Sequence, residues 1–288
     1  MHIKGDRINR RRVFIAFSCI GMIFFLAASV IGMHRKIIRI RDGEVTPFHT
    51  MIDEISSARA IFIGESHNNA AHHQTQLDVI RSLHGNDLPL AIGLEMIKKE
   101  DQASLDAWVS GKITEKDFIP IYRRNWGFSW GLYRDIFFYA QKHDIPLVAL
   151  NVPKNITKKV GQKGFASLTD EELAKLPPGI TCELDKEYMD HLVEVFQSKG
   201  RKDRSFEYFC EAQVLWDQSM AWYIMQYMKH NNHRTIVVLA GSIHAWKYGI
   251  PKQKKRYMSI EQKVIVPDLP IDPNTVREDD ADYLVLHR

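Results

Sequence analysis

Two histidines occur in the same short pattern at distant places in the sequence. The first pattern is Gly64-Glu65-Ser66-His67 and the second is Gly241-Ser242-Ile243-His244. A further carboxylate closes the segment Gly93-Leu94-Glu95. Imidazole nitrogens and carboxylate oxygens can together bind Mn, Fe, Co or Zn, can act as general acid and base on a water molecule, or can hold the polar groups of a ligand without turnover. The side chains predicted to be catalytic or metal-binding are Glu65, His67, Glu95 and His244.

Each of these polar groups follows a short apolar run. The runs are 60–64, 90–94, 146–150 and 235–240, and Asn151 follows the third. Continuously apolar runs of about five or six residues are typical of strands that are covered on both faces. Ligands bind outside the carboxyl ends of parallel strands, so we expect the polar groups to converge on one crevice if these strands are parallel neighbours. The glycines would let the backbone turn sharply and approach closely there.

Helical patterns separate the apolar runs, and they lie at about 68–84, 98–109, 130–143, 184–199 and 205–231. This alternation predicts an α/β fold with a mainly parallel central sheet flanked by helices. Residues 153–232 have no strong strand signal and are predicted to be a helical subdomain inserted before the last core strand. Two further strand candidates follow, at 257–266 and 283–286.

His72 and His73 fall in the first turns of the first helical pattern. His72 shares a helix face with Gln76, four residues later, which would let it point toward the same crevice. The alternative is that both histidines are polar residues of a solvated first turn.

The amino-terminal part of the chain, 1–41, differs from the remainder in charge and hydropathy. Its net charge is +8. The whole chain has a net charge of +4, so residues 42–288 are mildly acidic, with a net charge of −4. An acidic body argues against nucleic acid as a partner. Residues 13–33 are 21 uncharged, mostly apolar residues, long enough to cross a bilayer core. Residues 1–41 are therefore predicted to be a signal peptide or an uncleaved transmembrane anchor, and residues 42–288 an exported body.

The body contains two cysteines, Cys182 and Cys210. They could pair in an oxidising compartment or remain as two buried thiols, since two cysteines do not define a disulfide framework.

The chain resembles the ChaN-like haem-binding proteins of the haem-uptake/Tiki superfamily. The matching blocks cover most of residues 60–251, and they are GESHNNAAHHQTQL (64–77), GLEMIKKEDQASLDAWVSGKI (93–113), NWGFSWGLYRDIFFYAQKHDIPLVALNVP (125–153), EAQVLWDQSMAWYI (211–224) and VVLAGSIHAWKYGIP (237–251). The two Gly-x-x-His patterns with the blocks between them make this resemblance specific.

The resemblance implies a bacterial envelope protein that binds haem in iron uptake or storage, in some members as a pair of haems between two subunits of a homodimer. It also implies a tyrosine ligand to the haem iron, which suits ferric haem because an anionic oxygen favours Fe(III). Tyr133, in the shared Trp-Gly block, is the first choice. The haem-binding candidates are Tyr133, Trp126, Tyr188 and Tyr223, and Tyr208 is an alternative on the same footing as Tyr188 and Tyr223.

Two other functions remain open at this point. Tiki relatives use the two Gly-x-x-His motifs and a glutamate in a metal-dependent hydrolase, which would assign a peptidase or esterase activity to His67, His244 and Glu65 or Glu95. The third alternative is an envelope interaction module in which the polar cluster is inherited and inert. No convincing lipobox surrounds Cys19, which favours a peptide anchor over a lipid anchor.

Overall fold

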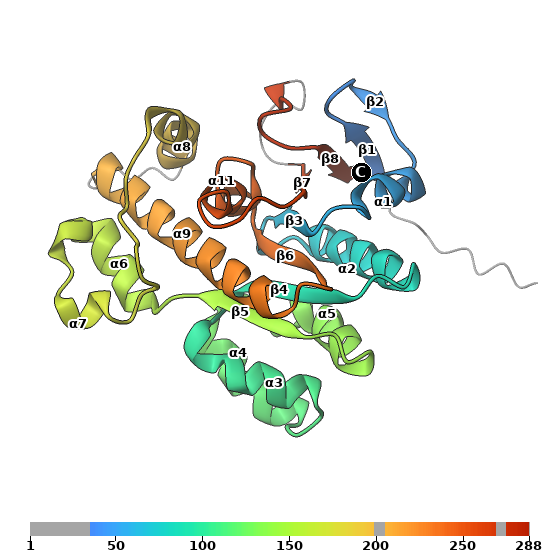
Figure 1. Cartoon of the computed structure of the whole chain (residues 1–288), viewed down its shortest axis with the longest axis horizontal. Helices are drawn as coiled ribbons and strands as arrows, with labels where there is room; N and C mark the ends of the chain where they lie inside the picture. The colour runs from blue at the N-terminus through green and yellow to red at the C-terminus, as the bar shows by residue number, and fades with distance from the viewer. Residues whose placement is uncertain (1–34, 199–204, 269–274, 288) are drawn as a thin grey trace, which may run out of the picture. The chain divides into compact units, whose positions relative to one another are not determined.

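One sheet of eight strands organises the computed structural model, which describes residues 35–198, 205–268 and 275–287. The strand order is β2-β1-β8-β7-β3-β6-β4-β5 (Figure 1). The six strands from β8 to β5 are parallel, while β1 pairs antiparallel with β8 and β2 pairs antiparallel with β1. The strands are β1 (Arg35–Arg39), β2 (Glu44–Val45), β3 (Ala60–Glu65), β4 (Leu90–Lys98), β5 (Leu147–Asn151), β6 (Thr235–Gly241), β7 (Gln262–Pro267) and β8 (Tyr283–His287).

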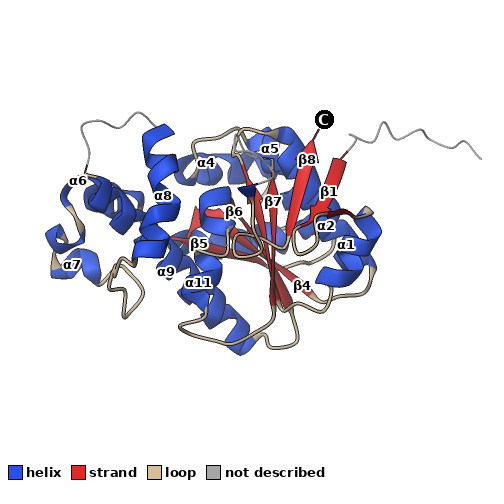
Figure 2. Ribbon diagram, turned by 90° about the horizontal axis from the view of Figure 1, so that it is seen from above, coloured by secondary structure: helices blue, strands red, loops and turns tan. Residues whose placement is uncertain are grey.

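The four apolar runs form neighbouring parallel strands, as predicted. They become β3, β6, β4 and β5, and Ile61 of β3 lies opposite Val237 of β6 in the register. Nearly every residue in these strands is buried, because helices cover both faces of the sheet (Figure 2). The mainly parallel α/β fold is thus confirmed.

Alternate residues of the strands feed two separate apolar cores. Ile61 and Ile63 pack with helices α1 to α5 on one face, while Ala60 and Phe62 pack with α6, α8, α9 and α11 on the other. The helices are α1 (Phe48–Ile55), α2 (Ala70–Gly85), α3 (Gln102–Val109), α4 (Glu115–Asn125), α5 (Trp130–Lys142), α6 (Lys154–Lys163), α7 (Asp170–Leu173), α8 (Lys186–Ser198), α9 (Phe206–His230), α10 (Ser242–Ala245) and α11 (Ile250–Lys254), with short 3₁₀ turns η1 (Lys99–Asp101) and η2 (Phe165–Ser167).

The stretch 153–232 contains helices α6 to α9 and no strand among its described residues. Its longest helix, α9, has 25 residues and contacts both α6 and β5. Cys182 and Cys210 are free thiols buried in this part of the second core.

The sheet begins earlier in the chain than the sequence pattern indicates. Strand β1 lies within the segment 1–41, yet it pairs with β8 along its whole length. Among the described residues, no helix combines the length and the apolar composition that crossing a bilayer requires. The apolar segment 13–33 lies outside the described residues.

Candidate functional site

The two Gly-x-x-His motifs fit against each other at the carboxyl edge of the sheet. Strands β3 and β6 are neighbours, and Glu65 lies opposite Gly241 in their register. A Cβ atom on Gly241 would lie 2.7 Å from Cε1 of His67, and a Cβ atom on Gly64 would lie 2.9 Å from Oγ of Ser242. Each glycine therefore leaves room for a side chain of the other motif.

Replacing Gly241 with alanine should push His67 out of position. The φ of Gly241 is −52°, which an alanine can adopt, so the effect is steric. We expect the free energy of unfolding to fall by about 2 kcal/mol, as in other overpacked interiors, with weaker ligand binding at the site. Gly85→Ala is the matched control, because nothing lies within 4 Å of its Cβ position. Equal stability of the two variants in urea denaturation would contradict the steric fit.

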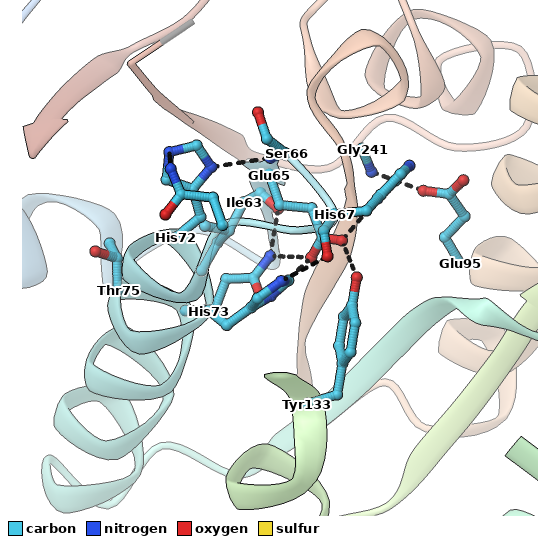
Figure 3. A network of polar contacts seen from close by, with 12 residues as sticks. Ile63, Glu65, Ser66, His67, His72, His73, Thr75, Glu95, Tyr133 and Gly241 are labelled. Atoms are coloured by element: carbon cyan, nitrogen blue, oxygen red, sulfur yellow. Dashed lines mark hydrogen bonds and ion pairs between the residues drawn. The ribbon is translucent and has the colours of Figure 1, made fainter. Parts of the chain in front are cut away.

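Glu65 is the buried centre of a hydrogen-bond network (Figure 3). Its Oε1 accepts hydrogen bonds from Nδ1 of His67 (2.8 Å) and from the Tyr133 hydroxyl, and its Oε2 accepts one from Nε2 of Gln76 (2.8 Å). Nδ1 of His73 lies 3.3 Å from Oε2. Burial alone would raise the pKa of Glu65, but the hydrogen bonds from His67 and His73 outweigh it and lower the pKa to about 2. Glu65 is thus a fixed negative charge.

The contact with Glu65 orients the ring of His67. Because Nδ1 donates to Glu65, Nε2 is left for other contacts. The ring packs against Trp126 and Phe128, with both centroid distances 4.9 Å. Burial lowers the pKa of His67, but the hydrogen bond to Glu65 and the charge of Glu95 outweigh burial and raise it.

His244 is held in the same way by a second carboxylate. Its Nδ1 lies 2.7 Å from Oδ1 of Asp217 on α9, and Oδ2 of Asp217 accepts a 2.7 Å hydrogen bond from the Tyr188 hydroxyl. Asp217 is fully buried. Burial raises the pKa of Asp217, and His244 opposes that shift. The site therefore has two carboxylate–imidazole pairs, one from each motif.

Glu95 lies beside both motifs. Its Oε2 accepts a 2.6 Å hydrogen bond from the backbone N–H of Gly241, and its Oε1 lies 3.9 Å from Nε2 of His244. Asn151 donates a 2.7 Å hydrogen bond to the backbone carbonyl of Glu95 and accepts one of 3.0 Å from Nε1 of Trp216. The predicted convergence of the strand ends is therefore present.

These groups open into a cavity of about 1670 Å³. Glu65, His67, Glu95 and His244 all line it. Its aromatic walls come from Trp126, Phe128, Trp216, Trp246 and Tyr248. A concave site with apolar walls and a few convergent polar groups is typical of a small-molecule or cofactor site, and this cavity is larger than most.

The candidates for haem ligation lie in different environments. Trp126 lines the cavity, whereas Tyr133, Tyr188 and Tyr223 are not among the described residues that line it. Tyr133 and Tyr188 are in the core, and their hydroxyls are bonded to Glu65 and Asp217. Tyr223 is 9% exposed, on the sheet-facing side of α9. Tyr208 is likewise not a lining residue in the described chain, so none of the four predicted tyrosines forms part of the cavity wall there.

His72 and His73 have separate roles, and both are buried rather than solvated. His73 joins the Glu65 network, while His72 clusters with Asp268 and His287, whose ligand atoms all lie within 4.8 Å of its own. Burial and His287 lower the pKa of His72 to about 4, so its ring is neutral at pH 7. The backbone N–H of Ser66 donates to Nδ1 of His72 (2.9 Å), and Nε2 lies 3.0 Å from Nδ2 of Asn69 and 3.4 Å from Oδ1 of Asp268. Both ring nitrogens of His72 therefore have polar partners in the described chain.

Sequence reasoning missed Asp217, Gln76 and Tyr248. Asp217 and Tyr248 lie in matching blocks of the sequence, but only the fold brings them to this edge of the sheet. The signal for Asp217 is that it is the one charged residue of α9 between Glu211 and Lys229.

Known proteins share this fold and this sequence pattern. The family model described as haem-binding uptake, Tiki superfamily, ChaN matches residues 51–253. The solved structure of ChaN from Campylobacter jejuni, described as cofacial haem binding, has a TM-score of 0.69 at 19% identity and covers 88% of this chain and 97% of its own.

Two weaker likenesses are an erythromycin esterase, EreC, and a succinoglycan biosynthesis protein. EreC has a TM-score of 0.48 at 13% identity over 88% of this chain and 83% of its own. The succinoglycan biosynthesis protein has a TM-score of 0.49 at 11% identity and covers 84% of this chain and 91% of its own. Likenesses this weak say nothing about activity. No curated protein matches the sequence. The family match spans well over half of the chain, and the chain therefore belongs to the ChaN family of haem-binding uptake proteins in the Tiki superfamily.

Proposed function

We propose that this chain binds haem in the cavity at the carboxyl edge of its sheet. The cavity itself carries the proposal. Its volume of about 1670 Å³ exceeds the range of about 300–1,000 Å³ that is common for small ligands. Most of the surface of its walls is apolar and includes aromatic side chains, which suits a flat macrocycle, and charged side chains of α6, α8 and residues 277–280 also line it. The family to which the chain belongs supports the same ligand.

The donor atoms around the cavity suit haem iron. His67, His191, His244 and Tyr248 line the cavity, and imidazole and phenolate are both axial ligands of haem. In addition, Nε1 of the cavity-lining Trp246 is buried without a hydrogen-bond partner in the described part of the chain. When bound, haem would supply an iron centre that one of these side chains can ligate.

Absorbance titration of the purified full chain with haemin tests this proposal. We expect a saturable Soret band at no more than two haems per chain. A spectrum that is the sum of protein and free haemin would contradict haem binding.

We infer that Tyr248 is the iron ligand, because it is the tyrosine that lines the cavity in the described chain. Its ring lies 4.9 Å from that of His191, and burial raises the pKa of its hydroxyl, so iron must displace the phenol proton. Tyr248→Phe should remove the phenolate signature from the absorbance and resonance Raman spectra of the haem complex. Tyr223→Phe is the control and should leave both spectra unchanged. Loss of the signature in the control with retention in Tyr248→Phe would contradict this ligand.

We also propose that residues 13–33 hold the body at the bacterial envelope, where it takes part in haem uptake or storage. The basic residues that flank this apolar segment support the location. We further propose that two copies of the chain form a homodimer that stacks two haems, since cofacial haem binding is described for ChaN of Campylobacter jejuni. Fractionation of cells and sizing of the haem-loaded protein test these two points.

A second function, metal-dependent hydrolysis, is supported by the two carboxylate–imidazole pairs. Glu65 and Asp217 hold Nδ1 of His67 and His244, as carboxylates do for metal-ligating histidines. The Nε2 atoms and Glu95 would hold a divalent ion only after their side chains move closer together, since the described residues bring three potential ligand atoms within 4.8 Å of one another only at His72, Asp268 and His287. Such an ion would lower the pKa of a bound water. We expect about one metal ion per chain, lost in a His67→Ala/His244→Ala variant, and peptidase or esterase activity lost with it. Metal-free protein with no activity in either screen would contradict hydrolysis.

A further inference from the structure

Helix α6 presents two lysines to the cavity. Lys154 and Lys158 are one turn apart, and both line the cavity together with Thr157 between them. The opposite side of the helix buries Ile156 and Val160 in the second core, where α6 packs against α9. That packing fixes which face of α6 meets the cavity.

Neither lysine has a carboxylate within ion-pair distance in the described part of the chain. Two other lysines of this region do form ion pairs. Lys159, next in sequence, pairs with Glu172 at 2.5 Å. Lys186, across the cavity on α8, pairs with Asp190 at 2.5 Å. The one lysine of α8 is therefore paired, whereas Lys154 and Lys158 of α6 are not, and the carboxylates that line the cavity lie on elements other than α6.

Unpaired cations beside apolar walls suit a ligand that is apolar in its body and anionic at one edge. The Trp216 ring, on α9, lines the same cavity as the two lysines. Residues four apart on a helix have Cβ atoms about 5–6 Å apart, so two ammonium groups on flexible stems can reach two neighbouring carboxylates. Haem carries its two propionates side by side on one edge of the macrocycle.

We propose that Lys154 and Lys158 bind the two propionates of haem and so orient it in the cavity. This proposal rests on the proposed haem binding. It adds that the anionic edge of the ligand faces α6 and that the two carboxylates contribute to affinity.

The test compares haemin with its dimethyl ester, whose carboxylates carry no charge, on the full chain. Each exposed ion pair contributes up to about 1 kcal/mol, so we expect a Lys154→Gln/Lys158→Gln variant to bind haemin about tenfold more weakly. The ester should bind the unmodified chain about tenfold more weakly than haemin does, and the same variant should not weaken the ester further.

The matched control is Lys163→Gln/Lys229→Gln, which removes the same charge from exposed positions that do not line the cavity in the described chain. It should bind haemin like the unmodified chain. Haemin binding that is unchanged in the Lys154/Lys158 variant, or equal for haemin and ester, would overturn the lysine assignment while leaving haem binding intact. Absence of haemin binding by the unmodified chain would overturn the proposed function, and the lysine assignment with it.

Discussion

Replacing Asp217 with alanine is expected to lower the free energy of unfolding by about 4 kcal/mol. The carboxylate is fully buried and serves two donors, the Tyr188 hydroxyl and Nδ1 of His244. Alanine would leave both without an acceptor in the core, and breaking a buried pair in this way costs about 3–5 kcal/mol. Urea denaturation at pH 7 measures the loss, and the freed His244 should also weaken ligand binding.

Two companion variants make this result interpretable. Asp217→Asn keeps the volume and one acceptor oxygen, so its loss should be intermediate. Asp135→Ala on α5 removes a carboxylate that is 70% exposed, and it should change stability by less than about 0.5 kcal/mol. If Asp217→Ala were as stable as Asp135→Ala, the pairing of His244 would not matter for the fold.

The second large effect is a loss of folding stability at low pH, which we expect from the protonation of Glu65. Its pKa is about 2 in the folded protein, against an ordinary value of 4.5. The unfolded chain therefore binds more protons between these values, so the contribution of Glu65 is complete above pH 4.5 and is lost as the pH falls through 2. A difference of this size corresponds to about 3 kcal/mol.

Glu65→Gln isolates this contribution, because glutamine has no charge to titrate. Between pH 5 and pH 2, the difference in free energy of unfolding between the unmodified chain and the variant should change by about 3 kcal/mol, because only the unmodified chain loses the contribution of Glu65. Glu207→Gln, at an exposed position on α9, is the control and should give a curve parallel to that of the unmodified chain. Parallel curves for Glu65→Gln as well would show that the carboxylate is not held in its charged form.

The strands and their common edge could be predicted because they depend on local features of the sequence. Continuous apolar runs such as AIFIG and TIVVLA have few alternatives to a strand covered on both faces. Once those strands are parallel, Glu65, His67, Glu95 and His244 must emerge at the same edge.

The tyrosines and Asp217 could not be placed in this way, because their roles depend on which face of a helix meets which neighbour. Tyr133 lies in a shared block, but its side of α5 faces the core, where its hydroxyl meets Glu65. Asp217 looks like one polar residue of a long helix until Tyr188 and His244 are seen on either side of it. Strand β1 was missed for another reason, since so short a segment acquires its structure only by pairing with β2 and with β8, the last strand of the described chain.

The order of the strands also constrains when the site can form during synthesis. Strand β3 lies between β6 and β7, and the Ser242 hydroxyl that bonds the Glu65 backbone carbonyl is 177 residues away in sequence. A ribosome must therefore make most of the chain while β3 has neither of its neighbours. Contacts of such long range slow folding and expose unpaired strand edges in the nascent chain. Binding by this cavity should thus be one of the last properties that a newly made molecule acquires.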